Sequence, residues 1–501
     1  MSKSESRPLS ERTARAGAWT VGGKLAGKAL DFISLLVLAR FLGPADFGVV
    51  AMALIAVQVV EALSELPLSA VLLNVEKPTD KMYDTAFSMA VLRSVAIVTV
   101  LAVLSWPLSI VYHEPRLIAL QCVLATAPAM RGLVSQRLTE FARVFDFRRN
   151  VALEIFGKAA SLVIATTLAI TTHSYWAIAA GMVSTTLVMM IASYIFAPQR
   201  IRFDFSQWRL FADMVGWNTA GQVLSAINWQ VDKIVLPRFV DTMTFGRFTA
   251  ADNLIGIPLQ AIVAPLSGPL YSAFVATHAK TDLARIYLKV YAGILSLVGI
   301  ILLMIAILSE PIVRLILGPK WLETAPILAW LALTAIAMLP STILPPLAMA
   351  LNQTRMVFVN LMVQFVVKVP LIVVLATTLH LQGVLIGHAI SSAVVFVTCL
   401  FIVRHLIGLS VKTQLLALVR PVAAMLPSAA FLLLALRTFS AQESALYLFL
   451  NLIWVGAGAG ILFAAGNLAL WKLAGCPDSY ESLAVRMAGN IIRKGQAVKK
   501  V

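Results

Sequence analysis

Long apolar stretches, separated by short polar connections, run through the whole chain. Each stretch has the roughly 20 residues that a helix needs to cross the hydrocarbon core of a bilayer. The predicted helices lie at residues 14–41, 45–73, 83–112, 116–136, 149–171, 174–197, 208–239, 244–274, 284–317, 323–351, 355–379, 381–407, 414–436 and 443–471. The pattern predicts an all-α polytopic membrane protein with about fourteen transmembrane helices. An even number of spans also places both ends of the chain on one side.

Positive charge alternates between the connections as expected for a multi-pass protein. The chain has 40 Lys and Arg against 24 Asp and Glu, which gives a net charge of +16. Connections rich in Lys and Arg stay in the cytoplasm. Alternate connections, including the arginine-rich one at 131–149, hold most of these cations, whereas the others carry little beyond Arg116, Lys320 and Arg437. Both termini are therefore predicted in the cytoplasm, and the charge follows topology rather than nucleic-acid binding.

The composition agrees with a membrane protein and supplies no catalytic chemistry. Hydrophobic residues make up 60% of the chain and charged residues 13%, and the mean hydropathy is +0.88. These values exclude a soluble globular protein. Cys122, Cys399 and Cys476 are far apart and have no metal or redox spacing. We expect no cofactor and no enzyme, and the charged, uncleavable start of the first apolar run does not predict a signal peptide.

Residues 19–53 and 217–251 share one pattern at a constant offset of 198, without a gap. Nine positions are identical, and they include the pairs Trp19/Trp217, Gly23/Gly221, Arg40/Arg238, Phe41/Phe239, Phe47/Phe245 and Gly48/Gly246. Shared Trp, Arg-Phe and Phe-Gly in one register are not expected by chance, even in so apolar a chain. The repeat predicts a duplicated helical bundle, which is how many transporters build two lobes around a substrate path.

A second match indicates how far each copy extends. The motif N-x3-E-x3-K from Asn150 in the fifth helix corresponds to N-x3-Q-x3-K from Asn360 in the eleventh. We therefore predict a cytoplasmic tail at 1–13, an N-lobe of helices 1–6 at 14–200, a parallel C-lobe of helices 7–12 at 201–410, helices 13–14 at 411–475 and a basic cytoplasmic tail at 476–501. This last tail is either an amphipathic segment on the anionic inner leaflet or a solvated extension.

Charged and polar residues inside the first and seventh predicted helices are the main functional signal. A Lys, Arg or Asp at the centre of a spanning helix costs about 2.5–3.5 kcal/mol on insertion scales, so it rarely faces lipid. Lys24, Lys28 and Asp31 recur at i, i+4 and i+7 and therefore share one face. The corresponding part of the seventh helix carries a second polar stripe, which consists of Asn218, Gln222, Ser225 and Asp232. We predict that the two stripes line a hydrated central cavity.

Several features also have purely structural explanations. Glu154 and Lys158, at i and i+4, could form a buried ion pair that only fixes packing. Gly23 and Gly27 belong to a near match to a phosphate-binding loop, but inside a membrane helix their spacing predicts a close helix contact instead. The eighth and tenth helices contain helix-breaking residues that mark either gates or static kinks, among them Pro258, Pro265, Pro269, Pro340, Pro345 and Pro346.

Three segments resemble the polysaccharide flippases of the multidrug/oligosaccharidyl-lipid/polysaccharide (MOP) exporter superfamily. The segment LLVLARFLGPADFGVVAMA contains an Arg-x-Leu-Gly-x-x-x-Phe-Gly pattern at Arg40, Leu42, Gly43, Phe47 and Gly48. The others are DKIVLPRFVDTMTFGRFTAADNLIGIP from Asp232 and ILGPKWLETAPILAWLAL from Ile316. Together with the number of spans, the resemblance covers essentially the whole chain and is strongest to the Wzx-type translocases of O-antigen, colanic acid and exopolysaccharide.

The resemblance implies a function and a site. It implies that an undecaprenyl-diphosphate-linked oligosaccharide repeat unit is translocated across the bacterial inner membrane by alternating access. Relatives have a V-shaped pair of lobes around a cationic cavity, so the residues expected to meet the diphosphate or acidic sugars are Lys24, Lys28, Arg93, Lys158 and Lys368. Helices 13 and 14 would offer a groove for the polyprenyl tail. The candidates for coupling to protons or sodium are Asp31, Asp232 and Asp252.

The implied partners are the lipid-linked oligosaccharide, membrane lipids, and a polysaccharide polymerase with export components, but no nucleic acid. Three other functions stay open. A drug or cation antiporter of the same superfamily would favour an acidic cavity, which the lysines oppose. A non-transporting scaffold of a polysaccharide synthesis complex would not need paired polar stripes across a duplicated bundle. A membrane polymerase is disfavoured by the short outer loops.

Overall fold

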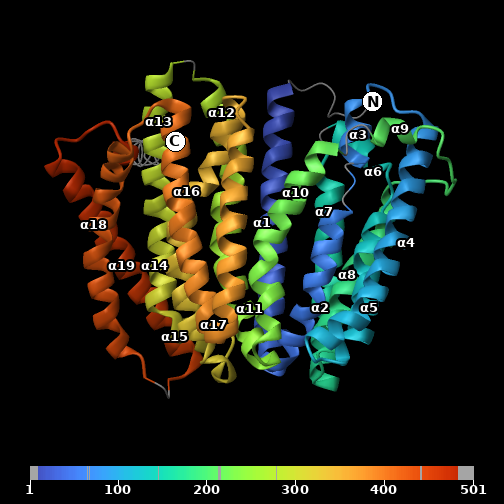
Figure 1. Cartoon of the computed structure of the whole chain (residues 1–501), viewed down its shortest axis with the longest axis horizontal. Coiled ribbons are helices and arrows are strands. Elements are labelled where there is room, and N and C mark those ends of the chain that lie inside the picture. The colour runs from blue at the N-terminus through green and yellow to red at the C-terminus, as the bar shows by residue number, and fades with distance from the viewer. Residues whose placement is uncertain are drawn as a thin grey trace, which may run out of the picture. The chain divides into compact units, whose positions relative to one another are not determined.

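The computed structural model describes residues 9–64, 66, 68–144, 146–212, 216–277, 279–440 and 443–482, without the side chains of 9–18, 20–21, 212, 216–223 and 280. Every regular element in these ranges is a helix, and none of the described residues forms a strand. The predicted all-α class is therefore confirmed (Figure 1).

The chain divides into two compact units. The first contains Met1–Thr249 and Ile372–Val384, and the second contains Ala250–Leu371 and Leu385–Val501. The division falls inside helix α11 (Thr242–Pro258) rather than at the predicted lobe boundary after residue 200. Its cause is local packing, because α10 (Gly216–Val235) lies against α2 (Pro44–Leu63). The lobe boundaries stay a prediction from the repeat.

The first unit is built from long helices joined by short ones. Besides α2, α10 and the start of α11, it contains α1 (Leu9–Phe41), α3 (Leu68–Asn74), α4 (Asp80–Val111), α5 (Arg116–Gly132), α6 (Leu138–Arg143), α7 (Arg148–Thr172), α8 (Trp176–Phe196), α9 (Trp208–Ala212) and the 3-10 turn η1 (Leu236–Arg238). Helix α7 packs against α1 and α8, and α5 packs against α2, α4 and α8. These helices run side by side in Figure 1.

Buried polar side chains and small residues hold the helices of the first unit together. Ser94 Oγ of α4 donates to the carbonyl of Ala129 in α5 at 2.9 Å, and Gln121 Nε2 of α5 donates to the carbonyl of Leu101 at 3.2 Å. Interhelical hydrogen bonds of this kind contribute about 0.6–2 kcal/mol each in a membrane. Between α7 and α8, Gly181 leaves no room for a side chain, so the backbones approach closely.

The second unit contains the other long helices, several of which are interrupted. Its elements are η2 (Leu259–Val263), α12 (Ala264–Val275), α13 (Lys280–Ile294), η3 (Leu295–Gly299), α14 (Ile300–Ile307), α15 (Ser309–Ile316), η4 (Pro319–Trp321), α16 (Thr324–Ala350), most of α17 (Arg355–Ile407), α18 (Val411–Ala435), η5 (Leu436–Thr438) and α19 (Ala445–Leu473). Helix α16 packs against α12, α14 and α15, and α18 packs against α19. The segments η2 and η3 are π-helices.

The long helices correspond to the fourteen predicted spans. Helix α17 bends at His380, where φ is 50° and ψ is −125°, so it contains the eleventh and twelfth spans. By length and composition, ten of the described helices, counting α17 once, can cross a membrane. Helices α1, α5 and α10 are outside this set. Helix α5 is too short, since it has only 17 residues. Helices α1 and α10 carry the polar stripes, and polar and charged residues lower the hydropathy of a helix.

One boundary differs from the prediction, and the prolines act differently in two spans. The seventh span begins at Gly216, because residues 208–212 form the separate short helix α9. The three prolines of the tenth span, predicted to mark gates or static kinks, lie inside α16, which is continuous from Thr324 to Ala350. The break expected in the eighth span is present, since the π-helix η2 follows Pro258 directly. Proline removes a backbone donor and crowds the preceding turn, but neighbouring helices can compensate for this in a membrane.

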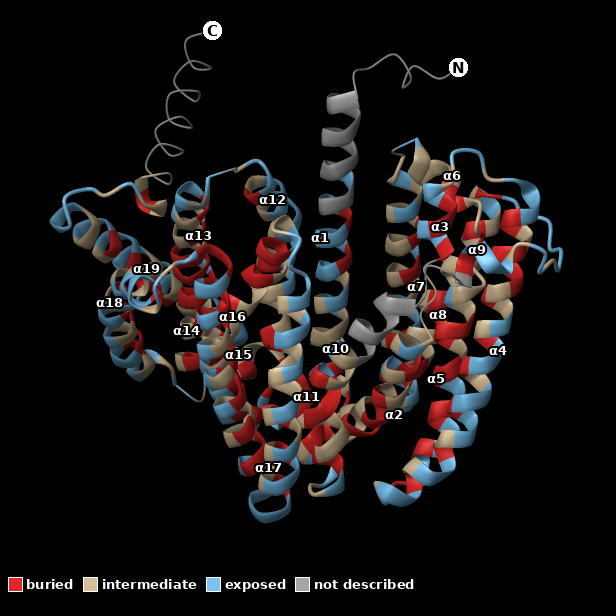
Figure 2. Ribbon diagram, turned by 45° about the horizontal axis from the view of Figure 1, so that its top comes forward, coloured by how far each residue is buried: buried red, intermediate tan, exposed pale blue. Residues whose placement is uncertain are grey.

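Large apolar side chains cover the outward faces of both units. On α4 the exposed residues include Val100, Val103 and Trp106, and on α19 they include Trp454 and Ile461. Figure 2 shows exposed residues recurring along α4 and α18. Apolar faces this extensive would aggregate in water, so they are suited to hydrocarbon. The surface pattern agrees with a multi-pass membrane protein.

Candidate functional site: the charged face of α1 and α7

One face of α1 carries the charges that its spacing predicts. Lys24, Lys28 and Asp31 are all exposed, whereas Gly23 and Gly27 on another face are buried. A helix that must cross a bilayer has thus been built with one small-residue face for packing and one charged face. The predicted sharing of a face by the three charged residues is confirmed within the first unit.

The buried glycines bring α7 close to α1. A Cβ atom at Gly23 would lie 2.5 Å from Val151 Cγ1, and a Cβ atom at Gly27 would lie 2.9 Å from Glu154 Oε1. A Cβ atom is not found this close to another heavy atom, so a side chain at Gly23 would press on Val151, and one at Gly27 would displace the flexible end of Glu154. The close helix contact predicted from Gly23-x3-Gly27 is confirmed, and it places the charges of α7 beside those of α1.

Lys158 of α7 is the centre of an ion-pair cluster. Its Nζ donates to Asp31 Oδ2 at 2.8 Å and lies 3.1 Å from Glu154 Oε1. Lys28 Nζ lies 3.9 Å from the same Asp31 oxygen. Only 18% of the Lys158 side chain is exposed, against 47% for Lys28 and Asp31. Lys158 is therefore neutralised by two carboxylates, as the predicted pair with Glu154 implied, while Lys28 stays open to a ligand.

Positive charge is in excess on this face. Lys24 is exposed and has no ion pair with any described residue. The face therefore holds three lysines against the two carboxylates of Asp31 and Glu154, an excess of one positive charge. Lysine is a natural counter-ion for phosphate and carboxylate groups. The arrangement can attract an anionic group to Lys24 and Lys28. Lys158 is paired with Asp31 and Glu154 on the same face.

The other predicted site residues lie on other helices. Arg93 is half-buried on α4, and Asp232 is buried on α10. Ser225 is exposed, while the side chains of Asn218 and Gln222 lie outside the described residues. Lys368, buried on α17, and Asp252, half-buried on α11, belong to the second unit. The polar stripe predicted for the seventh span stays a prediction.

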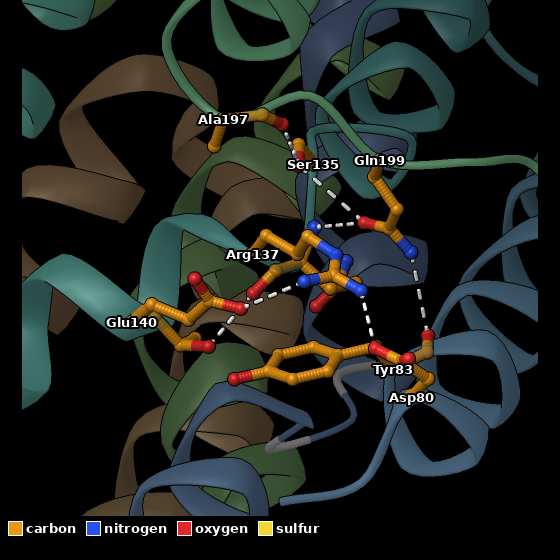
Figure 3. A network of polar contacts seen from close by, with 9 residues as sticks. Asp80, Tyr83, Ser135, Arg137, Glu140, Ala197 and Gln199 are labelled. Atoms are coloured by element: carbon orange, nitrogen blue, oxygen red, sulfur yellow. Dashed lines mark hydrogen bonds and ion pairs between the residues drawn. The ribbon is translucent and has the colours of Figure 1, made fainter.

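A polar network fixes the connections at one end of the first unit, and the sequence pattern did not identify it (Figure 3). Arg137 bonds to Asp80 at the start of α4 and to Glu140 of α6, the latter at 3.1 Å. Ser135 Oγ donates to the carbonyl of Ala197 at 2.7 Å, and Gln199 Oε1 accepts from the backbone amide of residue 136 at 2.9 Å. The network ties the ends of α4, α5 and α8 together.

The arginines of this connection are used for structure. In the sequence these arginines predicted only that the connection lies in the cytoplasm, yet several of them have defined contacts. Arg131 Nη1 lies 2.6 Å from Glu61 Oε1 of α2, and Arg143 Nη1 donates to the carbonyl of Glu76 at 3.1 Å. The guanidinium of Arg149 stacks 3.7 Å from the ring centre of Phe141. These contacts join α5, α6 and α7 to neighbouring segments at this end of the first unit.

A pocket of about 350 Å³ lies at the opposite end of the first unit. Its walls are Met52, Tyr112, His113, Glu114 and the residues from Pro237 to Thr242. Arg238 Nη1 and His113 Nδ1 are 3.2 Å apart across it. Glu114 accepts two bonds of 2.7 Å from Arg116, and this guanidinium lowers the pKa of the Glu114 carboxyl. No sequence motif indicated this pocket.

The two copies of the repeat meet at a pair of glycines. A Cβ atom at Gly48 would lie 1.9 Å from the carbonyl oxygen of Thr242, and one at Gly246 would lie 1.8 Å from that of Pro44. Gly48 and Gly246 are equivalent at the offset of 198, and so are Pro44 and Thr242. The contact is therefore reciprocal, as at a two-fold symmetric interface. The duplication seen in the sequence is present in the packing of α2 against α11.

Comparison with known proteins identifies the family. The family described as "Polysaccharide biosynthesis protein" matches residues 37–326. The chain belongs to this family. The matched region begins in α1, just before the Gly48 contact, and ends in α16, so it includes both copies of the glycine crossing. The resemblance expected from the segments at Arg40, Asp232 and Ile316 is confirmed.

Curated relatives in this family act in polysaccharide biosynthesis. The succinoglycan biosynthesis transport protein ExoT of Rhizobium meliloti (strain 1021) is 23% identical over 68% of this chain and 69% of its own. The lipopolysaccharide biosynthesis protein WzxC of Escherichia coli (strain K12) is 21% identical over 84% of this chain and 87% of its own.

Solved structures show the same fold. The lipid II flippase MurJ, in an inward closed conformation, covers 91% of this chain and 99% of its own with a TM-score of 0.72 and 13% identity. An inward-facing multidrug resistance MATE transporter of the MOP superfamily has a TM-score of 0.60 and 15% identity, and covers 76% of this chain and 94% of its own. ExoT is named a transport protein, and the two solved structures are named a flippase and a transporter, so the prediction of a membrane transporter family rather than an enzyme is confirmed.

Proposed function

We propose that the protein translocates undecaprenyl-diphosphate-linked oligosaccharide repeat units across the bacterial inner membrane by alternating access. The observation that carries the proposal is the cationic excess on the exposed face of α1, where Lys24 and Lys28 stand in front of the paired Lys158. A diphosphate offers several charged oxygens to such a face, and binding it there would offset the cost of charges inside the membrane.

The family and its relatives support the same class of substrate. Succinoglycan and lipopolysaccharide biosynthesis are the functions named for two relatives, and MurJ is named as a flippase of lipid II. Because the fold is shared by MurJ and a multidrug transporter, the fold alone does not select the substrate. The charge supports an anionic substrate, since a drug or cation antiporter would be served by an acidic face and α1 presents lysines.

The remaining assignments follow from this function. Arg93 and Lys368 would supply further positive charge along the path, and Asp31, Asp232 and Asp252 are proposed for coupling to protons or sodium. Asn218, Gln222 and Ser225 would line the polar path opposite α1. We place the lobes at 14–200 and 201–410, both termini in the cytoplasm, and a polysaccharide polymerase with its export components downstream of the translocated unit.

The test is removal of the two open lysines together. In the bacterium that carries the gene, the Lys24→Gln/Lys28→Gln variant should lower polysaccharide export at least tenfold, because each lost charge-assisted bond contributes about 1.5–3 kcal/mol. Lipid-linked repeat units should accumulate in the inner membrane. The matched control is Lys412→Gln, which removes an exposed lysine from the first turn of α18.

The accumulating precursor separates the functions that remain. A translocase variant makes the repeat unit and cannot move it, so the precursor rises while export falls. A scaffold variant would instead disturb assembly, and the precursor would not rise. Wild-type export in the double lysine variant, at normal protein level, would refute the role of α1 in substrate binding.

A further inference from the structure

We propose that Lys289 of α13 and Arg420 of α18 form a binding site for a lipid-borne phosphate or diphosphate, and that residues 477–482 of the same chain cover it as a tethered competitor. All of the groups involved belong to the second unit. The inference does not depend on which solute the protein transports, because it concerns a separate pair of cations.

The two cations lie at matching depths in helices that cross the membrane. Lys289 is the tenth residue of α13, which begins at Lys280, and Arg420 is the tenth residue of α18, which begins at Val411. At a rise of 1.5 Å per residue, each lies about 14 Å beyond the start of its helix. Cations at such positions are costly unless they meet an anion, water or a ligand. Neither is part of the charged face of α1.

Both cations are neutralised by one short segment. Lys289 Nζ lies 2.7 Å from Asp478 Oδ2, and Arg420 Nη1 lies 3.3 Å from Glu481 Oε1. Only 1% of the Glu481 side chain is exposed, so this carboxylate is inserted among the helices, whereas 56% of the Asp478 side chain is exposed. Two carboxylates three residues apart therefore meet cations that are 131 positions apart in the sequence.

A tyrosine between the two carboxylates seats the segment on α13. Ser296 Oγ of the π-helix η3 donates to Tyr480 Oη at 2.6 Å. A Cβ atom built on Gly293 would lie 3.6 Å from Tyr480 Cβ, so Tyr480 rests on a helix surface that has no side chain there. π-helical turns are frequent at functional sites, and this one presents its hydroxyl to the cover segment.

The cover segment is joined to α19 by a turn rather than by a helix. Gly475 and Cys476 have φ values of 79° and 54°, both in the left-handed region. Trp471 Nε1 donates to the carbonyl of Pro477 at 2.9 Å, which fixes where the segment departs. A change at this two-residue turn would withdraw Asp478 and Glu481 together. The geometry is thus that of a lid with two charged contacts and one hinge.

The chemistry of the site selects a phosphate-bearing lipid. Withdrawal of the lid alone would leave two unpaired cations among membrane helices, which is strongly unfavourable. Withdrawal in exchange for a doubly charged anion keeps both cations paired, and Lys with Arg is a natural receptor for phosphate oxygens. Leu416 and Val419, within one turn of Arg420, are exposed apolar side chains along which a lipid chain can lie.

A disulfide lock tests the exchange. The separation of 3.6 Å between the two Cβ positions is within the range of about 3.5–4.5 Å for disulfides. We would introduce Gly293→Cys with Tyr480→Cys into the full chain, after replacing the three native cysteines: Cys122→Ser, Cys399→Ala and Cys476→Ser. Native mass spectrometry of the purified protein would measure binding of phosphatidylglycerol, undecaprenyl diphosphate and, as a lipid without net charge, phosphatidylcholine.

The oxidised protein should bind the phosphate lipids at least tenfold more weakly than the same protein after reduction. A preference for phosphatidylglycerol would identify a membrane-lipid site, and a preference for undecaprenyl diphosphate would identify a site for the carrier lipid. Equal binding before and after reduction would overturn the proposal. The Lys289→Gln/Arg420→Gln variant should lose lipid binding in the reduced state, and lipid binding retained by this variant would also overturn the proposal.

Removal of the lid charges gives an independent test. The Asp478→Asn/Glu481→Gln variant should bind phosphatidylglycerol or undecaprenyl diphosphate more tightly than the wild type, because the competitor is weakened. Glu310→Gln is the matched control, since it removes a carboxylate that lies 2.6 Å from Arg314 in the same unit. A lower melting temperature without any gain in lipid binding would show that the segment is a permanent clamp. Binding is read directly, so either result leaves the proposed transport function untouched.

Discussion

The two copies of the repeat differ in charge and agree in backbone contact. In the first copy, Lys28 and Asp31 lie exposed on α1, and at the offset of 198 the second copy has Ala226 and Trp229 on α10. Trp229 is exposed and apolar. At the ends of the same segments, in contrast, Gly48 and Gly246 each rest on a carbonyl of the other copy.

This difference separates what the duplication keeps from what it changes. Any side chain at either glycine of the crossing would collide with a backbone carbonyl of the other copy, so both copies retain glycine there. A charged face can be altered in one copy without loss of the packing, because it is on the exposed side. We infer that the crossing is needed for the fold and that the charge was specialised for a ligand.

The largest effect is expected at the crossing. Gly48→Ala and Gly246→Ala each place a Cβ against a backbone carbonyl that cannot rotate away, so each should destabilise the protein by about 3 kcal/mol. The melting temperature of the purified protein in detergent would measure this. Gly456→Ala is the control, since its Cβ would meet nothing within 4 Å. A reciprocal contact requires similar losses at both sites, and a large loss at one alone would contradict it.

The next effect concerns the charge that the second copy lacks. Lys28→Ala gives α1 the residue that α10 has at Ala226, and it should weaken binding of undecaprenyl diphosphate about tenfold, or about 1.4 kcal/mol. The reason is the loss of an open cation beside Asp31. Ala226→Lys is the reciprocal variant and should not restore binding to Lys28→Ala, because the second copy has Trp229 at the position of Asp31. Titration by native mass spectrometry would decide, and full restoration would mean that the copies are interchangeable.

The coupling between α1 and α7 should be smaller. Asp31→Asn, Lys158→Met and the double variant form a cycle that isolates the pair at 2.8 Å. Because 47% of the Asp31 side chain is exposed, we expect a coupling of only about 1 kcal/mol in unfolding free energy. The measurement is thermal unfolding of the four proteins. Strict additivity would show that the pair does not connect the two helices.

The smallest effect is a pH dependence beside the crossing. Glu114 lines the pocket that Thr242 also lines, and Arg116 lowers the pKa of its carboxyl. A lowered pKa stabilises the fold above the ordinary carboxyl pKa, and this stability is lost as the pH falls through the folded value. Glu114→Gln should therefore reduce the difference in unfolding free energy between pH 7 and pH 3 by less than about 1 kcal/mol, which thermal unfolding at the two pH values would measure. An unchanged pH response in the variant would exclude the pair as its source.

Much of the fold followed from local pattern. Hydrophobic length located the spans, since a helix that crosses a bilayer must be apolar over about 20 residues. The π-helix after Pro258 agrees with a break at the prolines of the eighth span, whereas α16 runs through its three prolines, with α12, α14 and α15 packed against it. The glycine spacing in α1 also predicted a contact that the structure has.

The site was predicted less completely, and for a physical reason. Spacing placed Lys24, Lys28 and Asp31 on one face, because helical periodicity is a local property. It could not tell that Lys158 is held by Asp31 while Lys24 is left without an ion pair among the described residues. It gave no sign of the pairs that Lys289 and Arg420 form with Asp478 and Glu481, since these carboxylates lie far along the chain.

By itself, the sequence determined the all-helical membrane architecture, the duplication and the charged face of α1. Each of these follows from composition, from helical periodicity or from the constant offset between the two copies. Only the tertiary structure decided which charges are paired, which glycines touch, and where residues 477–482 insert. These depend on distances between helices that are remote in sequence, and a difference of about one ångström separates a neutralised lysine from an open one. The function of each charge is therefore a property of packing, not of the helix that carries it.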